Sequence, residues 1–270
     1  KKECDRRGIY HIDPFEFDCR QARSNIIDSV DPTGEVACLS NETWSGHPYS
    51  GGVTGKEIST RIHSTLPETK ILIVVRNQVE MIFSSYVQYI VHSRGFGSIE
   101  DFLYNNKHQQ VPFHRLGYYE YHKLARHYID LFGEDNVLVL PFETLQKEGR
   151  SFFFEQICDF VGVSGDFEVV KQERNAASYR EYVLLRKVGA LNLLNRNGPI
   201  HGFEVPRLLH IRPLLLSALK TFVSQGAVDK LIQRDKDSIK KSLVGEMLDS
   251  NKKLQKYCRF DLKSYGYDLF

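Results

Sequence analysis

A strand that leads directly into a helix, between Lys70 and Ile90, constrains the fold more than any other stretch of this chain. Ile71–Val75 is an uninterrupted apolar run, which predicts a strand buried on both faces, as in a parallel sheet. The spacing of apolar residues then changes to that of an α-helix, with one stripe formed by Val79, Ile82, Phe83, Tyr86, Val87 and Ile90. Such a junction lies at the carboxyl edge of a sheet, where α/β proteins bind ligands.

The residues around this junction have the chemistry of a phosphate site. Arg76 ends the strand, the first turn of the helix offers backbone N–H groups, and Ser84 follows two turns later. A guanidinium, backbone N–H groups and a hydroxyl are the donors that phosphate oxygens accept from. An ordinary α/β junction with an arginine beside the helix explains the same residues equally well.

The Arg76 to Ser84 segment resembles the 3′-phosphate-binding motif of sulfotransferases that use 3′-phosphoadenosine 5′-phosphosulfate as donor. Gln78 departs from the pattern, because the family usually has a proline or a small residue there. The resemblance implies an α/β fold of the three-layer, P-loop-like sulfotransferase type, with a short parallel sheet. We expect one domain over residues 1–270, with a largely helical C-terminal part from about residue 178.

Two further apolar runs are expected to lie beside Ile71–Val75 in this parallel sheet. They are Val36–Leu39 and Val137–Leu140. The second run and the residues that follow it, as far as Leu145, are similar to the same region of sulfotransferases. Within that stretch Glu143 is interpreted as structural. Ser98 and Asp101 predict a capping box at the start of another helix.

The loop after Val36–Leu39 would face the same crevice as Arg76. Sulfotransferases of bacteria often have a Ser-x-Glu segment here, so Glu42 is the candidate general base, and His47 is the second candidate. A surface glutamate is the alternative. The implied reaction is in-line transfer of a sulfuryl group to a hydroxyl acceptor, such as a carbohydrate, with the base removing the hydroxyl proton.

A segment near residue 175 also resembles the family. In sulfotransferases an asparagine followed closely by a serine commonly reaches back to the donor. On this resemblance alone, the donor-binding candidates are Arg174, Asn175 and Ser178. A loop ending in a helix N-cap at Ser178 explains most of the same residues. The charged segment 234–241 is expected to be a solvated surface or a loop.

The loop that would wrap the 5′-phosphosulfate is not found between Lys1 and Asp31. Sulfotransferases begin with an apolar strand and a loop rich in Gly, Ser and Thr that carries a lysine or arginine. We expect this loop to lie upstream of Lys1. The alternative is that the protein has lost this half of its donor site.

Two other functions remain open. Ser50–Lys56 partly resembles a Walker A loop, which would make the protein a kinase-like nucleotide-binding enzyme using Lys56. Ser50 and Glu57 stand where that motif needs Gly and Ser or Thr, and no apolar strand precedes it directly. A flexible loop before a helix over Lys56–Leu66 is the favoured interpretation. The third possibility is a non-catalytic binding protein with the sulfotransferase fold.

Composition limits the partners and the compartment. A net charge of +2 gives no reason to expect nucleic acid. Five scattered cysteines lack metal-ligand spacing, so no metal is expected, and reduced thiols indicate the cytoplasm, with the secretory lumen as alternative. No apolar run approaches the roughly 20 residues that span a bilayer. Nothing in the sequence indicates an oligomeric state.

Overall fold

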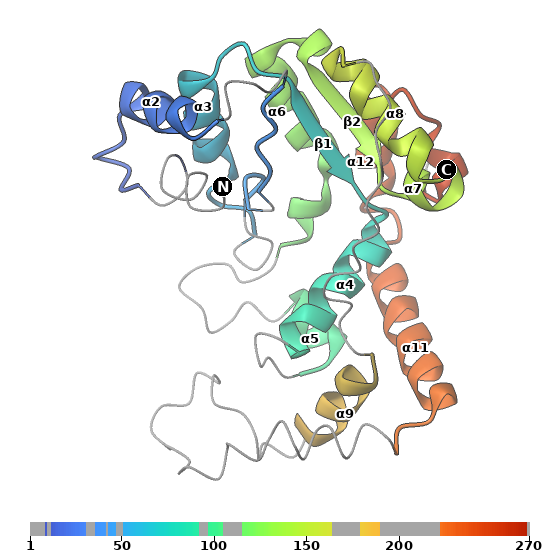
Figure 1. Cartoon of the computed structure of the whole chain (residues 1–270). Coiled ribbons are helices and arrows are strands. Elements are labelled where there is room, and N and C mark those ends of the chain that lie inside the picture. Colours follow the sequence, from blue (N-terminus) through green and yellow to red (C-terminus); the bar gives the residue numbers. More distant parts are fainter. Residues whose placement is uncertain are drawn as a thin grey trace. The chain divides into compact units, whose positions relative to one another are not determined.

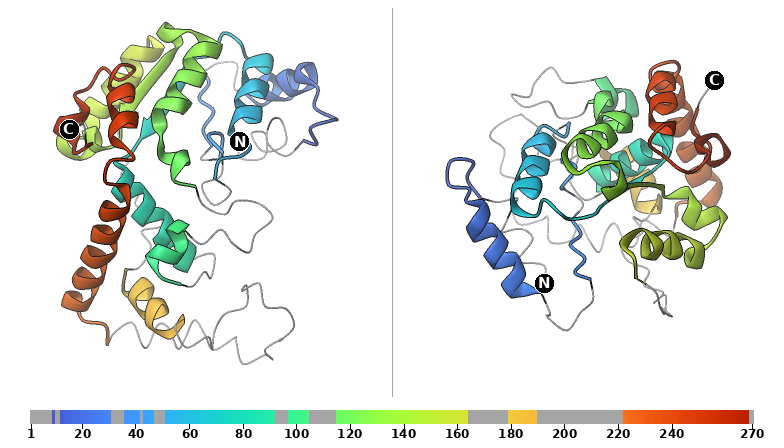
Figure 2. Two further views of the ribbon diagram at one scale, coloured as in Figure 1. Left: turned by 180° about the vertical axis from the view of Figure 1, so that it is seen from behind. Right: turned by 90° about the horizontal axis from the view of Figure 1, so that it is seen from above.

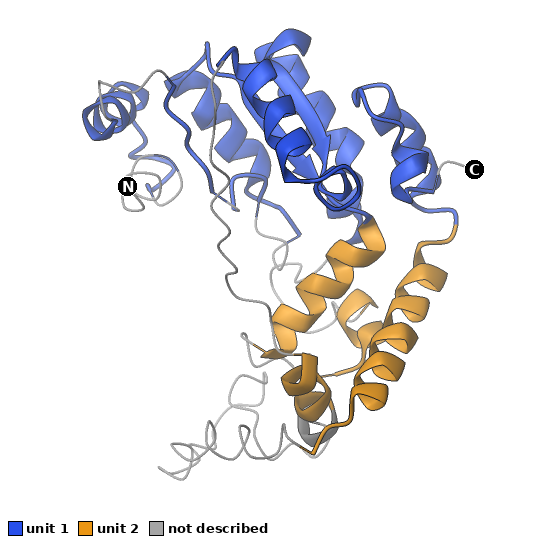
Figure 3. Cartoon of the chain, turned by 45° about the vertical axis from the view of Figure 1, so that its right-hand side comes forward, with its two compact units in different colours: residues 1–77, 111–170, 245–270 blue, residues 78–110, 171–244 orange. Residues whose placement is uncertain are grey.

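The computed structural model describes residues 9, 12–30, 36–41, 43–46, 51–91, 97–104, 115–163, 179–189 and 222–268 (Figure 1). These residues form two compact units (Figure 3). Unit 1 comprises residues 1–77, 111–170 and 245–270, and unit 2 comprises residues 78–110 and 171–244. The expectation of a single domain stays a prediction.

Unit 1 contains a parallel pair of strands, β1 (Ile71–Val75) and β2 (Val137–Pro141), and confirms an α/β fold. Ile71 pairs with Val137 and Val75 with Pro141. The other elements of this unit are helical: α2 (Cys19–Ser29), α3 (Gly55–Thr65), η3 (Leu116–Tyr119), α6 (Tyr121–Phe132), η4 (Glu134–Asn136), α7 (Glu143–Lys147), α8 (Arg150–Val161), α12 (Leu248–Gln255) and η6 (Leu262–Tyr265).

Helices α6 and α8 cover opposite faces of this sheet, as the views from the front and from behind both show (Figures 1 and 2). Leu138 and Leu140 of β2 are buried against Phe153 and Phe160 of α8. Helix α6 contacts both strands and also packs against α12. The finer three-layer, P-loop-like arrangement stays a prediction.

Two expectations about the strands were wrong. Residues 36–40 form no strand, and Val36 is 50% exposed. Ala37 and Cys38 give this run little apolar area to bury, so it lacks the driving force that pairs longer strands. Strand β1 is buried on one face only, because Leu72 and Val74 remain 39% and 46% exposed.

Unit 2 is helical in its described residues. It consists of α4 (Gln78–Val91), α5 (Ile99–Tyr104), α9 (Tyr179–Gly189) and α11 (Gln225–Leu243), and α11 packs against the other three. The predicted helix after Ser98 is confirmed. The backbone N–H of Ser98 donates to Asp101 Oδ2 at 2.8 Å, and that of Asp101 donates to Ser98 Oγ at 3.1 Å.

Residues 234–241 lie within α11 and form no loop, and most of their charged side chains are exposed, as expected for a solvated surface. Asp235 is the exception. Asp235 is only 1% exposed. Its carboxylate accepts a hydrogen bond from the Tyr182 hydroxyl and lies 3.5 Å from Arg186 Nη2. A buried carboxylate needs such partners, because an unpaired buried charge is strongly unfavourable. The charged run therefore includes a residue of the interior of unit 2.

None of the helices within the described ranges combines the length and the apolarity needed to cross a bilayer.

Candidate functional site

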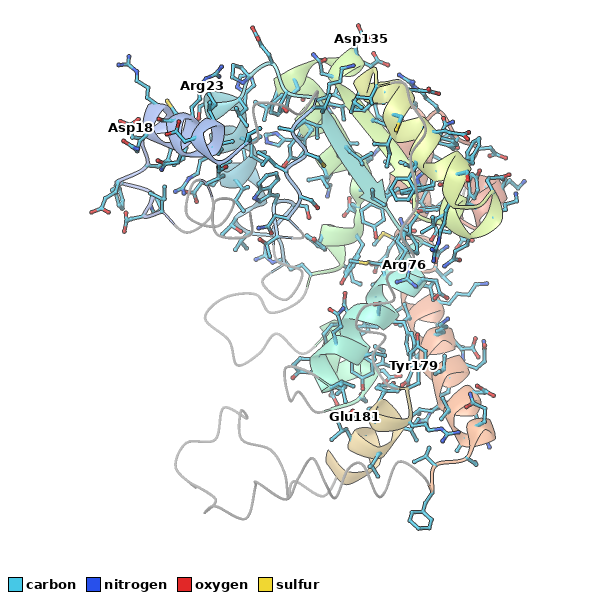
Figure 4. The ribbon with its side chains drawn as sticks, viewed as in Figure 1. Asp18, Arg23, Arg76, Asp135, Tyr179 and Glu181 are labelled. Carbon is cyan, nitrogen blue, oxygen red and sulfur yellow. The ribbon has the colours of Figure 1, made fainter. Side chains whose placement is uncertain are left out.

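Both strands of the sheet end at the same edge, and Arg76 stands there (Figure 4). The backbone N–H of Phe142 donates to the carbonyl of Val75 at 2.7 Å, which extends the pairing of β1 and β2 by one bond. The Arg76 guanidinium carbon lies 5.5 Å from the centroid of the Phe142 ring. A cation over an aromatic face is held electrostatically, so Phe142 helps to keep the guanidinium at the sheet edge.

Glu143 connects the ends of the strands to the C-terminal segment. Its carboxylate accepts one hydrogen bond from the backbone N–H of Asn77 at 2.8 Å and another from the Tyr267 hydroxyl at 3.0 Å. The Asn77 side chain in turn donates to the carbonyl of Gly266 at 2.7 Å. These contacts fix the backbone directly after Arg76. Glu143 is thus structural, as the sequence indicated.

Two buried tyrosines complete this region. Burial raises the pKa of Tyr121 well above its usual value, and nearby Tyr119, Tyr118 and Glu143 raise it further, whereas Arg76 lowers it. Burial, followed by the charge of Glu143, also raises the pKa of Tyr267. Both phenols therefore stay protonated near neutral pH, and the Tyr267 hydroxyl acts as a hydrogen-bond donor to Glu143.

The Tyr121 hydroxyl is buried and has no hydrogen-bond partner among the described residues. We call the residues at this edge the sheet-edge cluster, which consists of Arg76, Asn77, Tyr121, Phe142, Glu143 and Tyr267. A guanidinium together with a phenol donor fits an anionic ligand, because both groups favour acceptor oxygens.

The predicted site residues are only partly described. Arg76 belongs to unit 1 and Ser84 to α4 of unit 2, where its side chain is partly buried. The others lie outside the described residues: Glu42, His47, Arg174, Asn175 and Ser178. The predicted roles of all seven stay predictions.

The described residues contain no group of three or more His, Cys, Asp or Glu side chains that could hold a metal ion.

The segment that resembles a Walker A loop packs against other parts of unit 1. The Tyr118 hydroxyl donates to the carbonyl of Gly46 at 3.0 Å and lies 3.2 Å from Ser45 Oγ. A Cβ atom on Gly52 would lie 2.5 Å from the Tyr118 ring. The backbone at Gly52 is therefore covered by a side chain, and Lys56 is exposed at the start of α3. This arrangement gives the kinase interpretation no support.

Sequence reasoning missed Asn77 and Tyr121 as parts of the site. Asn77 follows Arg76 directly, but its partners are 66 and 189 residues away in the chain. Tyr121 looks like any other residue of the apolar stripe of α6. The one available signal was strand order, since Arg76 directly follows β1 and Glu143 comes two residues after β2.

Residues 58–168 match a model of the sulfotransferase family. The matched segment is less than half of the chain, and over that segment the chain is similar to the sulfotransferase family. The crystal structure of a sulfotransferase from Alicyclobacillus acidocaldarius is similar over 67% of this chain and 71% of that chain, with 22% sequence identity and a TM-score of 0.45. None of the curated proteins compared with this chain matches it.

The part of the chain that matches the sulfotransferase model includes most of the sheet-edge cluster. Arg76, Asn77, Tyr121, Phe142 and Glu143 lie within residues 58–168, and so does Ser84. Tyr267 and the predicted residues Glu42, His47, Arg174, Asn175 and Ser178 lie outside the matched segment.

Proposed function

We propose that this protein is a sulfotransferase that uses 3′-phosphoadenosine 5′-phosphosulfate as donor, and that Arg76 and Ser84 bind its 3′-phosphate. The observation that carries the proposal is the position of Arg76, which directly follows β1 within the segment that matches the family model. Helix α4 begins at Gln78, two residues later, and the N-terminus of a helix favours anions.

The sheet-edge cluster supports this role for Arg76. Glu143 holds the backbone of Asn77, and Phe142 lies against the guanidinium, so the cation is placed before a ligand arrives. A positioned donor loses little freedom on binding, which increases affinity. The charge of Arg76 is also close enough to Tyr121 to affect its pKa.

The acceptor is proposed to be a hydroxyl compound such as a carbohydrate. Its oxygen would attack the sulfur atom while the bond from sulfur to the phosphate oxygen breaks, and the hydroxyl proton would pass to a base. Glu42 is the proposed base, with His47 second, and Arg174, Asn175 and Ser178 are further proposed donor contacts. No metal is required, because sulfuryl charge can be stabilised by cationic groups and N–H donors.

Calorimetric titration with adenosine 3′,5′-bisphosphate and with AMP tests the role of Arg76 and Ser84. Arg76→Ala should weaken binding of the bisphosphate by roughly 2–4 kcal/mol and Ser84→Ala by about 1 kcal/mol, because only the arginine makes a charge-assisted contact. AMP lacks the 3′-phosphate, so its affinity should change little in either variant.

Equal weakening of both ligands would contradict the proposal and indicate a structural role for Arg76. Lys56→Ala serves as the control for the kinase alternative and should leave the affinity for adenosine 3′,5′-bisphosphate unchanged. If Lys56→Ala instead abolished ADP binding, the nucleotide would bind at the Ser50–Lys56 loop. Absence of turnover with the donor and a range of hydroxyl acceptors, despite normal donor binding, would favour the non-catalytic alternative.

A further inference from the structure

A cavity of about 370 Å³ in unit 1 is lined by residues from α6 and from the end of α12. Its six lining residues, which we call the basic pocket, are His122, Lys123, Arg126, Lys253, Lys256 and Tyr257. Four of the six side chains carry a full positive charge, and none carries a carboxylate. None of the six belongs to the sheet-edge cluster, and the mechanism proposed above uses none of them. The volume lies in the range of small-ligand sites.

Nearby carboxylates compensate only part of this charge. Lys123 Nζ lies 2.6 Å from Glu120 Oε2, and Arg126 Nε lies 3.6 Å from Asp130 Oδ2. Lys123, Arg126 and Asp130 are exposed and Glu120 is half-buried, and pairs at the surface contribute only about 0–1 kcal/mol. Within the described part of the chain, Lys253 and Lys256 form no ion pair with a carboxylate. The pocket therefore keeps a surplus of positive charge.

Helix stability does not explain the cations contributed by α6. Lys123 lies in the first turn of α6, where no residue of the turn is acidic and the N-cap residue Glu120 is its ion-pair partner. The N-terminus of a helix carries a partial positive charge, so cations there are unfavourable. By contrast, Lys253 lies in the last turn of α12, where a cation is favourable. The positive charge on the α6 side is thus the unusual feature, and an anion would relieve it.

A contact with Ser250 holds His122 in the basic pocket, and the charges around the pocket affect the pKa of its imidazole. Its Nδ1 atom lies 2.8 Å from Oγ of Ser250, which is 2% exposed. Burial lowers the pKa of His122, and Lys253 and Lys123 lower it further, whereas Glu120 raises it. Lysines from both sides of the pocket therefore act on the same imidazole.

We propose that the basic pocket binds an anion that carries two or more phosphate or sulfate groups. Such a ligand would place separate negative charges against the α6 side and against Lys253 and Lys256. Several charge-assisted contacts to one ligand give the affinity that a single exposed ion pair lacks. The ligand could be a polyphosphate or a sulfated sugar, which share this chemistry.

Calorimetric titration of the whole chain with inorganic tripolyphosphate, and separately with a trisulfated disaccharide, tests the proposal. The double variant Lys253→Gln/Lys256→Gln should lose at least about tenfold in affinity. The matched control is Lys252→Gln/Arg259→Gln, which removes the same charge from exposed positions that do not line the cavity. It should bind within about twofold of the wild-type chain, a difference that corresponds to only a few tenths of a kcal/mol.

Equal losses in the two double variants would overturn the proposal, because net charge alone would then explain binding. Failure of the wild-type chain to bind either probe would overturn it as well. Whichever probe binds more tightly identifies the source of the anion. Thermal unfolding of both double variants confirms that they fold, since all four substituted side chains are exposed.

A second measurement locates the bound anion. The imidazole signals of His122, assigned by NMR with His122→Gln, should show a raised pKa on saturation with tripolyphosphate, because a nearby anion favours the imidazolium. An unchanged pKa of His122 in the saturated protein would overturn the proposal. Arg76→Ala should leave tripolyphosphate binding unchanged. Loss of binding in that variant would place the anion at the sheet edge instead.

Discussion

Glu143 shows how much of the candidate site depends on single side chains. Its two oxygens accept from the Asn77 backbone, which precedes Glu143 in the chain, and from the Tyr267 hydroxyl near the C-terminus. No local pattern in the sequence indicates either bond, because the partners are 66 and 124 residues away. Hydrogen bonds to a charged acceptor contribute more than neutral ones, about 1.5–3 kcal/mol each.

We expect Tyr267→Phe to lower the free energy of unfolding by about 1–3 kcal/mol, because the Glu143 carboxylate loses a charge-assisted bond in a partly buried place. Tyr265→Phe is the matched control, since its hydroxyl lies 3.4 Å from Glu148 in an exposed position. The control should change the free energy by less than about 0.5 kcal/mol. Urea unfolding of both variants measures these values. A similar loss in the two variants would contradict the role given to Glu143.

The elements that the sequence predicted correctly are those specified by local patterns. The apolar run Ile71–Val75 and the helical spacing after it became β1 and α4, and Ser98 and Asp101 form their capping box. The failures depend on tertiary contacts. The run at 36–39 finds no strand partner, and Asp235 is buried because α9 supplies Tyr182 and Arg186. The basic pocket combines α6 with α12, which are far apart in sequence.

The loop before α3 gives a prediction at the scale of one element. Gly52 has a φ of +68°, and an added Cβ would lie 2.5 Å from the Tyr118 ring. Gly52→Ala should therefore destabilise the protein by about 1–3 kcal/mol, through backbone strain and overpacking. Gly226→Ala is the control, because Gly226 lies within α11 and nothing is within 4 Å of its Cβ position.

The control substitution should leave stability unchanged or raise it by up to about 1 kcal/mol, since alanine favours a helix more than glycine does. Thermal and urea unfolding of both variants provide the comparison. If Gly52→Ala proved as stable as the parent chain, the close contact between this loop and Tyr118 would be wrong.

At the scale of the whole molecule, each of the two units has a buried core of its own. Unit 1 buries Leu138 and Leu140 under α8. In unit 2 the Tyr182 ring packs edge-on against Phe83 and Tyr86, with ring centroids 5.9 Å and 5.8 Å apart. Local stability follows such cores, and contiguous cooperative regions can open separately. A substitution in one core is therefore expected to loosen mainly its own unit.

Asp235→Asn tests this expectation. It removes the charge that pairs with Arg186 and leaves the guanidinium largely buried, so it should cost about 3–5 kcal/mol. Hydrogen exchange should then accelerate in α4, α9 and α11, and much less in β1, β2 and α6. Asp237→Asn is the matched control, because Asp237 is exposed and, among the described residues, accepts a hydrogen bond from Gln233 on the same helix. Equal acceleration of hydrogen exchange in both units would show that the two cores unfold together. Acceleration confined to unit 2 would establish that the buried pair of Asp235 and Arg186 stabilises that unit alone.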